Sequence, residues 1–462
     1  MTACSTNPAT GQQQFAAFMS PSQETQVGAE QHAEVIKEYG LYNDQALQAY
    51  VNEIGRKVSS NTERPDVIYK FYVVDSPIVN AFALPGGYIY VSRGLLALAN
   101  SEAELAAVLA HETGHITARH SAERYSRGVL TNLGAAVLSA AVGAPGVSQA
   151  ASIGSDLYIK SYSRGQENQA DSLGIRYLAH AGYNPGAMST FLGSLQQDSV
   201  LESRISGSKE PISYFSTHPA TDERVGLTVS EAAKYPATGA EERNAYLQRL
   251  NGLVFGDSAE QGFTRGQDFY HPGLGFTLKL PKDFTISNQP TQLVATSQSG
   301  AALIFDMASS DADPSVFIRE IWMKDAPLQN LEKITVNGMN GAAASFAGTV
   351  NNQPMTIQLV AIQWKPGTIA RFQIALPQNS SSQLVTDLKA ATYSFRAMSA
   401  QEIQTVKPYR VTLVTAGAGD TVASLAARQP FTEFSQDRFR LLNALKPGEE
   451  IKPGVTYKLV TG

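Results

Sequence analysis

The sequence predicts a multi-domain protein with three folded parts. A mainly α-helical domain with a small β-sheet is expected over residues 30–255, an α+β domain with antiparallel strands over 256–400, and a linker with a small strand–helix–helix–strand module over 401–462. The length of 462 residues supports this, because domains average about 150 residues and the chain therefore holds roughly three. Helical spacing of apolar residues dominates up to about residue 253. Short alternating runs that predict strands follow it, at 276–280, 302–305, 316–322, 355–364 and 369–376, and a helix-like run at 381–391 ends them.

Composition excludes several classes of protein. Hydrophobic residues make up 43% and charged residues 17%, which is ordinary for a globular chain. With 36 Lys and Arg against 41 Asp and Glu, the net charge of -5 gives no basic footprint for nucleic acid. No apolar run reaches the length of a transmembrane helix. The uncharged segment 128–155 is expected to form a helix pair packed on the protein, with a membrane-touching hairpin as the alternative.

The amino terminus contains Cys4, the one cysteine of the chain, which excludes an intrachain disulfide and a cysteine-based zinc cluster. Its setting, Thr2–Asn7, resembles the end of a bacterial lipoprotein signal, in which the cysteine is lipid-modified. The apolar part of such a signal is missing, so the chain would be a mature or truncated form. Residues 1–29 are expected to form a flexible tail, and an incidental exposed cysteine is the alternative.

The first domain is expected to hold a small sheet among its helices. The runs 67–75 and 87–92 are rich in β-branched and aromatic residues, and Pro85-Gly86-Gly87 forms a turn before the second.

A metal-binding motif lies in this domain, at His111-Glu112-Thr113-Gly114-His115. Ser101 and Glu104 form a capping-box pair, so a helix should begin near residue 102 and run through the motif. On that helix His111 and His115 stand one turn apart and can bind one ion, and zinc suits two imidazoles. Glu112 would not bind the metal but would take a proton from the attacking water and pass it to the leaving amine. The alternative is a chance pair of surface histidines.

A catalytic zinc usually has a third protein ligand. Glu167 is the candidate, and Asp171, on the same face of a second helix-like run, would accept the free N–H of a ligating histidine. His120 follows His115 by five residues, about 140° round a continuous helix, so we expect it on the wrong face and in a structural role. An ordinary solvated acidic pair is the alternative for Glu167 and Asp171.

These residues carry a family resemblance. The motif is accompanied by Glu167-x-x-x-Asp171, Asn80–Gly87, Gly94-Leu95-Leu96, Thr217-His218-Pro219 and Arg224. Over residues 30–250 the chain resembles the gluzincin zinc metallopeptidases related to the CAAX prenyl protease, the Oma-type mitochondrial protease and their periplasmic bacterial relatives. The resemblance implies a zincin-like fold and endopeptidase activity with one zinc ion per chain, held by His111, His115 and Glu167.

The resemblance also implies a substrate-binding segment, Asn80 to Ser92, as an edge strand that pairs with an extended peptide. Its candidate residues are Asn80, Ala81, Phe82, Gly86 and Gly87. The chain departs from the membrane-embedded relatives because it lacks spanning helices, which argues against intramembrane or prenylated substrates.

His218 has two roles open by the same resemblance. In a mobile loop near the metal it would stabilise the oxyanion of the tetrahedral intermediate, or it would occupy the fourth zinc position and restrain the enzyme. Residues 203–208 are a plausible hinge for that loop, and a simple His-Pro turn is the alternative. Arg224 would anchor the loop, or would form a surface salt bridge.

The carboxy-terminal segment 409–462 resembles a LysM module, which binds glycans containing N-acetylglucosamine such as peptidoglycan. Gly419-Asp420-Thr421 before a helix, Asn443 with Leu445, and Lys452-Pro453-Gly454 support this. A structural module without glycan binding is the alternative, since Asp420 and Thr421 also serve as a helix start. The α+β domain loosely resembles PsbP-like folds, and its sequence indicates no role.

The leading functional hypothesis is a zinc metalloendopeptidase of the bacterial cell envelope that degrades unfolded or misassembled envelope proteins. It would be periplasmic, anchored to the outer membrane if Cys4 is lipidated. Two alternatives are a chaperone that binds extended segments with little proteolysis and a wall-binding scaffold with a vestigial peptidase domain. Glu112 favours the enzyme, because a binding module needs no base between two ligands.

Overall fold

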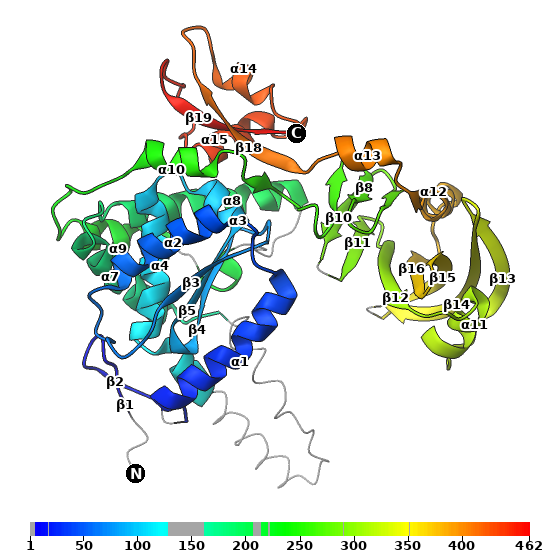
Figure 1. Cartoon of the computed structure of the whole chain (residues 1–462), viewed down its shortest axis with the longest axis horizontal. Coiled ribbons are helices and arrows are strands. Elements are labelled where there is room, and N and C mark those ends of the chain that lie inside the picture. The colour runs from blue at the N-terminus through cyan, green and yellow to red at the C-terminus, as the bar shows by residue number, and fades with distance from the viewer. Residues whose placement is uncertain are drawn as a thin grey trace. The chain divides into compact units, whose positions relative to one another are not determined.

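The computed structural model describes residues 5–16, 18–127, 161–206, 214–219, 222–289, 291–350 and 352–462. It confirms a multi-domain chain of helices and several antiparallel sheets, divided into two compact units. The first unit comprises Met1–Gly256 with Tyr409–Gly462, and the second Asp257–Pro408 (Figure 1). Cys4, the apolar segment 128–155 and residues 207–208 of the expected hinge lie outside the described residues. Among the described helices, none is long and apolar enough to cross a membrane.

The first unit is mainly helical and surrounds one buried helix, α4. Its helices before residue 256 include α1 Pro21–Tyr39, α2 Gln45–Ser59, α3 Arg93–Leu98, α4 Glu102–Thr117, α7 Arg164–His180, α8 Ala187–Ser206, α9 Asp222–Ala232 and α10 Arg243–Leu250. Ser101 caps α4 by accepting the Glu104 N–H at 3.2 Å, as the capping-box pattern predicts. Every residue of α4 from Ala103 to Thr117 is buried, so this helix is the centre of the core.

A three-stranded sheet of β3 Lys70–Val74, β5 Tyr88–Ser92 and β4 Ala81–Leu84 packs in this unit. β3 and β5 are parallel, and β4 is antiparallel to β5, so the strand order is β3-β5-β4. Both strands predicted from the sequence are present. The segment Asn80–Ser92, expected to be one edge strand, is instead the edge strand β4, a turn and the central strand β5. The turn η1 Pro85–Gly87 joins β4 to β5.

A flexible tail was expected over residues 1–29, but residues 5–16 and 18–29 contain a β-hairpin and the start of a helix. β1 Ser5–Thr6 pairs with β2 Gln13–Gln14, and α1 begins at Pro21. Ser20 and Gln23 form a reciprocal capping box at the start of α1, a local signal that fixes the helix start well before residue 30. Asn7, between the two strands, is only 4% exposed.

The helices α4 and α7 pack closely because glycines lie at their contact. A Cβ atom on Gly174 would stand 3.0 Å from the backbone nitrogen of His111, and one on Gly114 would stand 3.0 Å from the carbonyl oxygen of Ala170. The backbones therefore approach each other directly. This approach places the first turns of α7 beside the last turns of α4.

Residues 409–462 fold as a strand, two helices and a strand: β18 Tyr409–Thr415, α14 Val422–Ala426, α15 Ser435–Leu442 and β19 Thr456–Thr461. β18 pairs antiparallel with β19 and also with β6 Val254–Phe255. The Lys458 side chain is fully buried, and its Nζ donates to the carbonyl oxygens of Ala97 at 2.6 Å and Ala99 at 2.7 Å. The segment expected to be a separate domain is thus packed into the same unit as the helical part.

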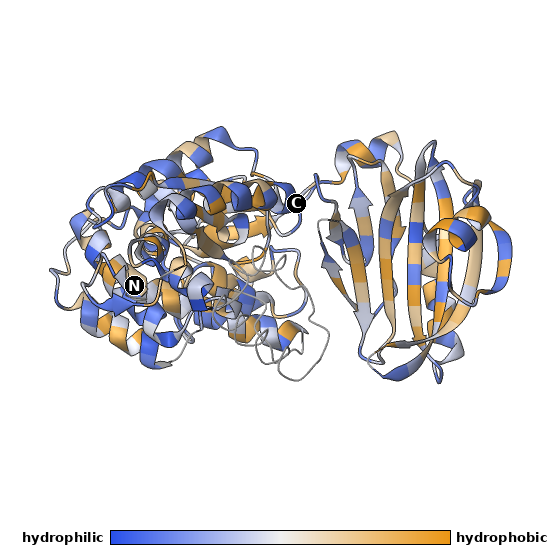
Figure 2. Cartoon of the chain, turned by 90° about the horizontal axis from the view of Figure 1, so that it is seen from below, coloured by the Kyte–Doolittle hydropathy of each residue, from blue (hydrophilic) through white to orange (hydrophobic). Residues whose placement is uncertain are grey.

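The second unit consists of antiparallel sheets with helices between and after their strands. Seven strands follow the order β10-β11-β12-β16-β15-β14-β13, and four follow β17-β9-β8-β7. The strands are β7 Phe263–Arg265, β8 Asp268–His271, β9 Phe276–Lys279, β10 Phe284–Asn288, β11 Gln292–Ser297, β12 Ala302–Ser309, β13 Gln329–Val336, β14 Met339–Val350, β15 Gln353–Lys365, β16 Thr368–Pro377 and β17 Arg396–Ala397. Hydrophobic and hydrophilic residues alternate along the strands (Figure 2), as expected for a sheet with one buried face.

Helix α12 Ser382–Tyr393 was expected from the sequence, and α13 Ala400–Thr405 lies in the expected linker. One predicted strand of this unit is wrong. The apolar run 316–322 forms helical turns, α11 Pro314–Val316 followed by η3 Phe317–Trp322, because Asp313 and Pro314 start a helix there. A short apolar run does not distinguish a strand from a buried helical turn.

Candidate metal centre

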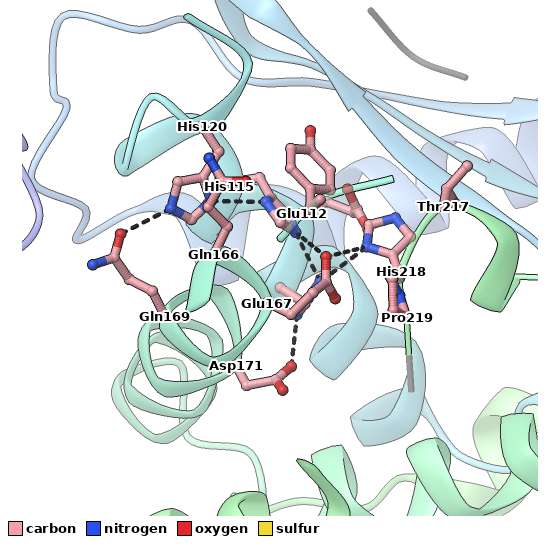
Figure 3. A network of polar contacts seen from close by, with 12 residues as sticks. Glu112, His115, His120, Gln166, Glu167, Gln169, Asp171, Thr217, His218 and Pro219 are labelled. Atoms are coloured by element: carbon pink, nitrogen blue, oxygen red, sulfur yellow. Dashed lines mark hydrogen bonds and ion pairs between the residues drawn. The ribbon is translucent and has the colours of Figure 1, made fainter. Parts of the chain in front are cut away.

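The predicted metal ligands come together from two helices and a loop. α4 carries His111, Glu112 and His115, and α7 carries Glu167 in its first turn. His218 enters from the loop after η2 Tyr214–Ser216 and lies against both helices (Figure 3). The side chains of these five residues are at most 1% exposed.

The potential ligand atoms of His111, His115, Glu167 and His218 all lie within 4.8 Å of one another, and we call these four residues the donor cluster. Nε2 of His111 and Nε2 of His115 are 3.0 Å apart. The Glu167 carboxylate is 3.6 Å from the first nitrogen and 3.4 Å from the second. Nδ1 of His218 lies 3.1 Å from Glu167 Oε1 and 3.4 Å from His111 Nε2.

The chemistry of the donor cluster fits a divalent cation. Nδ1 of His111 lies 2.8 Å from Asp171 Oδ1, and since a carboxylate accepts, that nitrogen carries the proton and Nε2 presents its lone pair. This lone pair and the Glu167 carboxylate face each other at 3.6 Å, where an ion between them would bind both. The two oxygens of Glu112 are buried without a hydrogen-bond partner beside the cluster. Imidazole nitrogens with a carboxylate are a donor set that zinc prefers.

A comparison with known families agrees with this geometry. The family described as "Peptidase family M48" matches residues 45–230, which contain α4 and α7. Residues 45–230 are thus similar to peptidase family M48. This match agrees with the family resemblance of the sequence over these residues.

Curated relatives match the same part of the chain. A beta-barrel assembly-enhancing protease of Yersinia pestis is 32% identical over 230 residues, which cover 47% of this chain and 46% of that protein. The protein of the same name from Escherichia coli K12 is 30% identical, covering 53% and 51%. A mitochondrial metalloendopeptidase OMA1 of Arabidopsis thaliana is 34% identical, covering 41% and 37%. The chain spans about half or less of the length of these relatives.

Among solved structures, a cyanobacterial PsbP from Synechocystis matches with 11% identity and a TM-score of 0.23, covering 28% of this chain and 91% of that one. A TM-score this low carries no conclusion about the second unit.

The two carboxylates at the donor cluster, Glu167 and Glu112, differ in their electrostatic setting. Burial would raise the pKa of Glu167, but His218, Arg224 and hydrogen bonds hold it well below its ordinary value. Burial raises the pKa of Glu112, and nearby His218 and His111 oppose this only in part. Glu167 is therefore ionised, as a ligand must be, whereas Glu112 has a stronger tendency to take up a proton.

Arg224, which is 2% exposed, links α7 to the loop of His218. Its guanidinium donates to Asp171 at 2.6 and 2.8 Å and lies 2.7 Å from Glu167 Oε2. The same guanidinium donates to the backbone carbonyls of His218 at 3.4 Å and Pro219 at 3.5 Å. Arg224 is thus a buried partner of two carboxylates and not a surface salt bridge.

The candidate substrate-binding residues divide into two groups. Ala81 and Phe82 lie on the edge strand β4, preceded by Asn80, whose Oδ1 is buried without a partner. Gly86 and Gly87 lie in the turn η1 with φ of 77° and 98°. Cβ atoms there would stand 2.9 Å from the carbonyl oxygen of Glu24 and 2.4 Å from that of Ile68, so packing and backbone conformation already require both glycines.

His120 is not on the wrong face, contrary to the sequence-based expectation. α4 ends at Thr117 and Arg119 has a φ of 59°, so the chain turns back and the rotation of a continuous helix does not apply. Nδ1 of His120 lies 2.8 Å from Nδ1 of His115, and its Nε2 lies 2.8 Å from Gln169 Oε1. Burial lowers the pKa of His120 to about 4, against the Gln169 hydrogen bond, so its imidazole is neutral.

Two buried tyrosines also contact the cluster and carry no sequence signal. Tyr162 stacks on His115 with ring centroids 3.7 Å apart, and Tyr214 stacks on His218 at 4.3 Å. Both residues reach the centre from segments outside the HExxH and Glu167 motifs. Only the tertiary fold places them.

Proposed function

We propose that this chain is a zinc metalloendopeptidase of the bacterial cell envelope that hydrolyses unfolded or misassembled envelope proteins. The observation that carries the proposal is the buried group of His111, His115 and Glu167 with the carboxylate of Glu112 beside it. The names of the bacterial relatives, beta-barrel assembly-enhancing proteases, support an envelope role. A chaperone without proteolysis would have no need for Glu112.

The residues divide the work of peptide hydrolysis. When bound by His111, His115 and Glu167, zinc supplies Lewis-acid chemistry, because it makes water acidic and polarises the scissile carbonyl. Glu112 lies one residue from a ligand, and its carboxylate accepts the proton of the attacking water and delivers it to the leaving amine nitrogen. Its free carboxylate oxygens and raised pKa suit both transfers.

Substrate would bind as an extended strand along β4. This strand lies at the edge of its sheet and packs near α4, so a peptide paired with it would pass the donor cluster. Main-chain hydrogen bonds demand little of the side chains, which suits a protease that acts on unfolded segments of many sequences. Asn80, Ala81 and Phe82 are the residues that we assign to this contact.

His218 would restrain the enzyme by occupying the position that substrate needs. Its Nδ1 already lies among the ligand atoms, and Tyr214 and Arg224 hold its ring and its backbone. If most molecules are in this closed form, apparent substrate affinity falls in proportion to the competent fraction. We therefore expect His218→Ala to raise casein cleavage at unchanged zinc content.

If His218 stabilises the oxyanion, the same substitution should lower cleavage activity and not raise it. If His218 donates to the developing oxyanion, His218→Ala lowers kcat by about 10²–10³-fold. His180→Ala, at an exposed histidine on α7, is the control and should change neither the rate of casein cleavage nor the zinc content. A clear fall in kcat with zinc retained would contradict restraint.

The finer fold and the location belong to the same proposal. The peptidase domain would be zincin-like, and residues 409–462 would be a LysM-like module that holds the enzyme on peptidoglycan, which their strand–helix–helix–strand order supports. The protein would be periplasmic, and lipidation of Cys4 would anchor it to the outer membrane.

The wall contact is tested with the whole chain, because residues 409–462 share a sheet and buried contacts with the peptidase domain. We expect the chain to co-sediment with purified peptidoglycan and to be released by N-acetylglucosamine oligomers. A chain that stays in the supernatant at every salt concentration would show that the module is structural.

The proposed activity is tested by measuring zinc content and casein cleavage of the purified chain before and after chelation. One zinc per chain and cleavage that is lost with zinc and restored by it are expected. Zinc-independent cleavage, or zinc binding with no cleavage of any unfolded protein, would reject the peptidase.

A further inference from the structure

A chain of hydrogen bonds runs from the amino-terminal hairpin to the donor cluster. Nδ2 of Asn7 donates to Oε1 of Gln169 at 2.9 Å, and the same oxygen lies 2.8 Å from Nε2 of His120. Nδ1 of His120 lies 2.8 Å from Nδ1 of His115 (Figure 3). His115 and His120 are each 1% exposed and Asn7 is 4% exposed, whereas Gln169 between His120 and Asn7 is partly exposed.

One backbone N–H group determines which atom is the donor in each of these hydrogen bonds. The Ala9 N–H donates to Oδ1 of Asn7 at 2.9 Å, and since a backbone N–H can only donate, the amide of Asn7 must point its Nδ2 at Gln169. Gln169 therefore presents its oxygen, which accepts from both Asn7 and His120. A reversed Gln169 amide would place two N–H groups against each other.

The consequence reaches His115 through His120. Because Gln169 offers an oxygen, Nε2 of His120 carries the proton, and in a neutral imidazole the other nitrogen then accepts. Nδ1 of His120 must accept the Nδ1–H of His115. That leaves the lone pair of His115 on Nε2, the atom that lies 3.0 Å from Nε2 of His111 in the donor cluster. The opposite order of protons would put N–H on Nε2 and prevent metal binding.

We propose that His120 is a positioning residue that fixes the metal-binding tautomer and ring orientation of His115, and that Asn7 of the amino-terminal hairpin sets the direction of this hydrogen-bond chain through Gln169. The inference rests on the proposed zinc site. His120 would accept the Nδ1–H of His115 in the same way as the Asp171 carboxylate accepts that of His111 at 2.8 Å, but His120 is a neutral acceptor. Partners of this kind typically change metal affinity or activity by about 10–100-fold.

The two ends of the His120 ring can be tested separately. The oxygen of an asparagine side chain stands as many bonds from Cα as Nδ1 of histidine, and the amide of glutamine stands as far as Nε2. His120→Asn therefore keeps an acceptor for His115, whereas His120→Gln keeps the contact with Gln169 and leaves His115 without its acceptor. We expect His120→Gln to weaken zinc binding by about 10–100-fold and His120→Asn to stay within a few-fold of wild type.

Asn7→Asp tests the end of this series of hydrogen bonds that lies farthest from the donor cluster. A carboxylate still accepts the Ala9 N–H, so the turn of the hairpin is retained, but the donor to Gln169 is lost. Zinc affinity should fall by about 2–10-fold, the worth of one neutral hydrogen bond.

The measurement is the zinc dissociation constant of metal-free protein, obtained by competition with a chromophoric chelator, together with the visible spectrum of the cobalt-substituted protein. The control is His32→Gln, which by the same bond count removes the contact of His32 Nδ1 with the Tyr90 hydroxyl at 2.6 Å and should alter thermal stability without altering zinc affinity.

Equal zinc affinity and equal cobalt spectra in His120→Asn and His120→Gln would overturn the proposal, whether both match wild type or both fall together. A purely structural role would lower the melting temperature of the metal-free variants alike and would not separate the two amides. If wild-type protein itself binds no zinc, the proposed peptidase function fails instead, and that result is distinct.

Discussion

Glu112→Gln is expected to lower kcat for casein cleavage by about 10²–10⁴-fold, the usual contribution of a general acid–base group. The amide cannot accept the proton of the attacking water or return it to the leaving nitrogen. Glutamine has nearly the same shape, and Glu112 makes no hydrogen bond that the change would break. Elemental analysis should still find one zinc per chain.

Stability provides a second readout for the same variant. Burial raises the pKa of Glu112, so at pH values above the ordinary pKa of a glutamate this carboxyl destabilises the metal-free fold relative to the unfolded chain. A neutral amide removes this cost, and the melting temperature of the metal-free variant should be equal to or higher than that of wild type. Glu53→Gln, at an exposed position on α2, is the matched control and should change neither activity nor stability. Near wild-type cleavage by Glu112→Gln would mean that another residue is the base.

The central helix and its motif were predictable because their signals are local. Ser101 and Glu104 mark the start of α4, and the spacing of His111 and His115 places both on one face of it. The sequence places Glu167 and Asp171 on one face of a second helix-like run, and the family pattern supports their roles as ligand and partner. Their approach to α4 depends on Gly114 and Gly174, whose role appears only when two backbones are in contact.

The failed predictions share a physical cause: each used sequence information from too small a part of the chain. The rotation argument for His120 assumed that the helix continues past His115 without a break. α4 instead ends at Thr117, and the chain turns at Arg119, which has a positive φ. The flexible tail was inferred from composition, although Ser20 and Gln23 already formed a capping pattern. The attachment of residues 409–462 depends on β6 and Lys458, contacts between distant segments that no local pattern predicts.

His115→Ala is expected to remove zinc and activity together. Loss of an outer partner of a ligand typically costs about 10–100-fold in metal affinity, so loss of the ligand itself should cost more than about 100-fold. His115 lies on the buried helix α4, and its Nε2 is 3.0 Å from Nε2 of His111, so its loss removes one of the two imidazoles of the motif from the site. Zinc per chain, measured after dialysis, should fall to near zero. Full occupancy in this variant would contradict the assignment of the ligands.

Glu167→Gln should be less severe than His115→Ala, for a reason particular to this centre. His218 already places Nδ1 3.1 Å from Glu167 Oε1, so when the carboxylate is lost three imidazoles still face the ion. We expect zinc affinity to fall in Glu167→Gln, and to fall much further when His218→Ala is added. Because both residues would contribute to one ion, the two losses should be more than additive. Additive effects would mean that His218 does not reach the metal, and its influence on cleavage would then have to come from contact with the substrate.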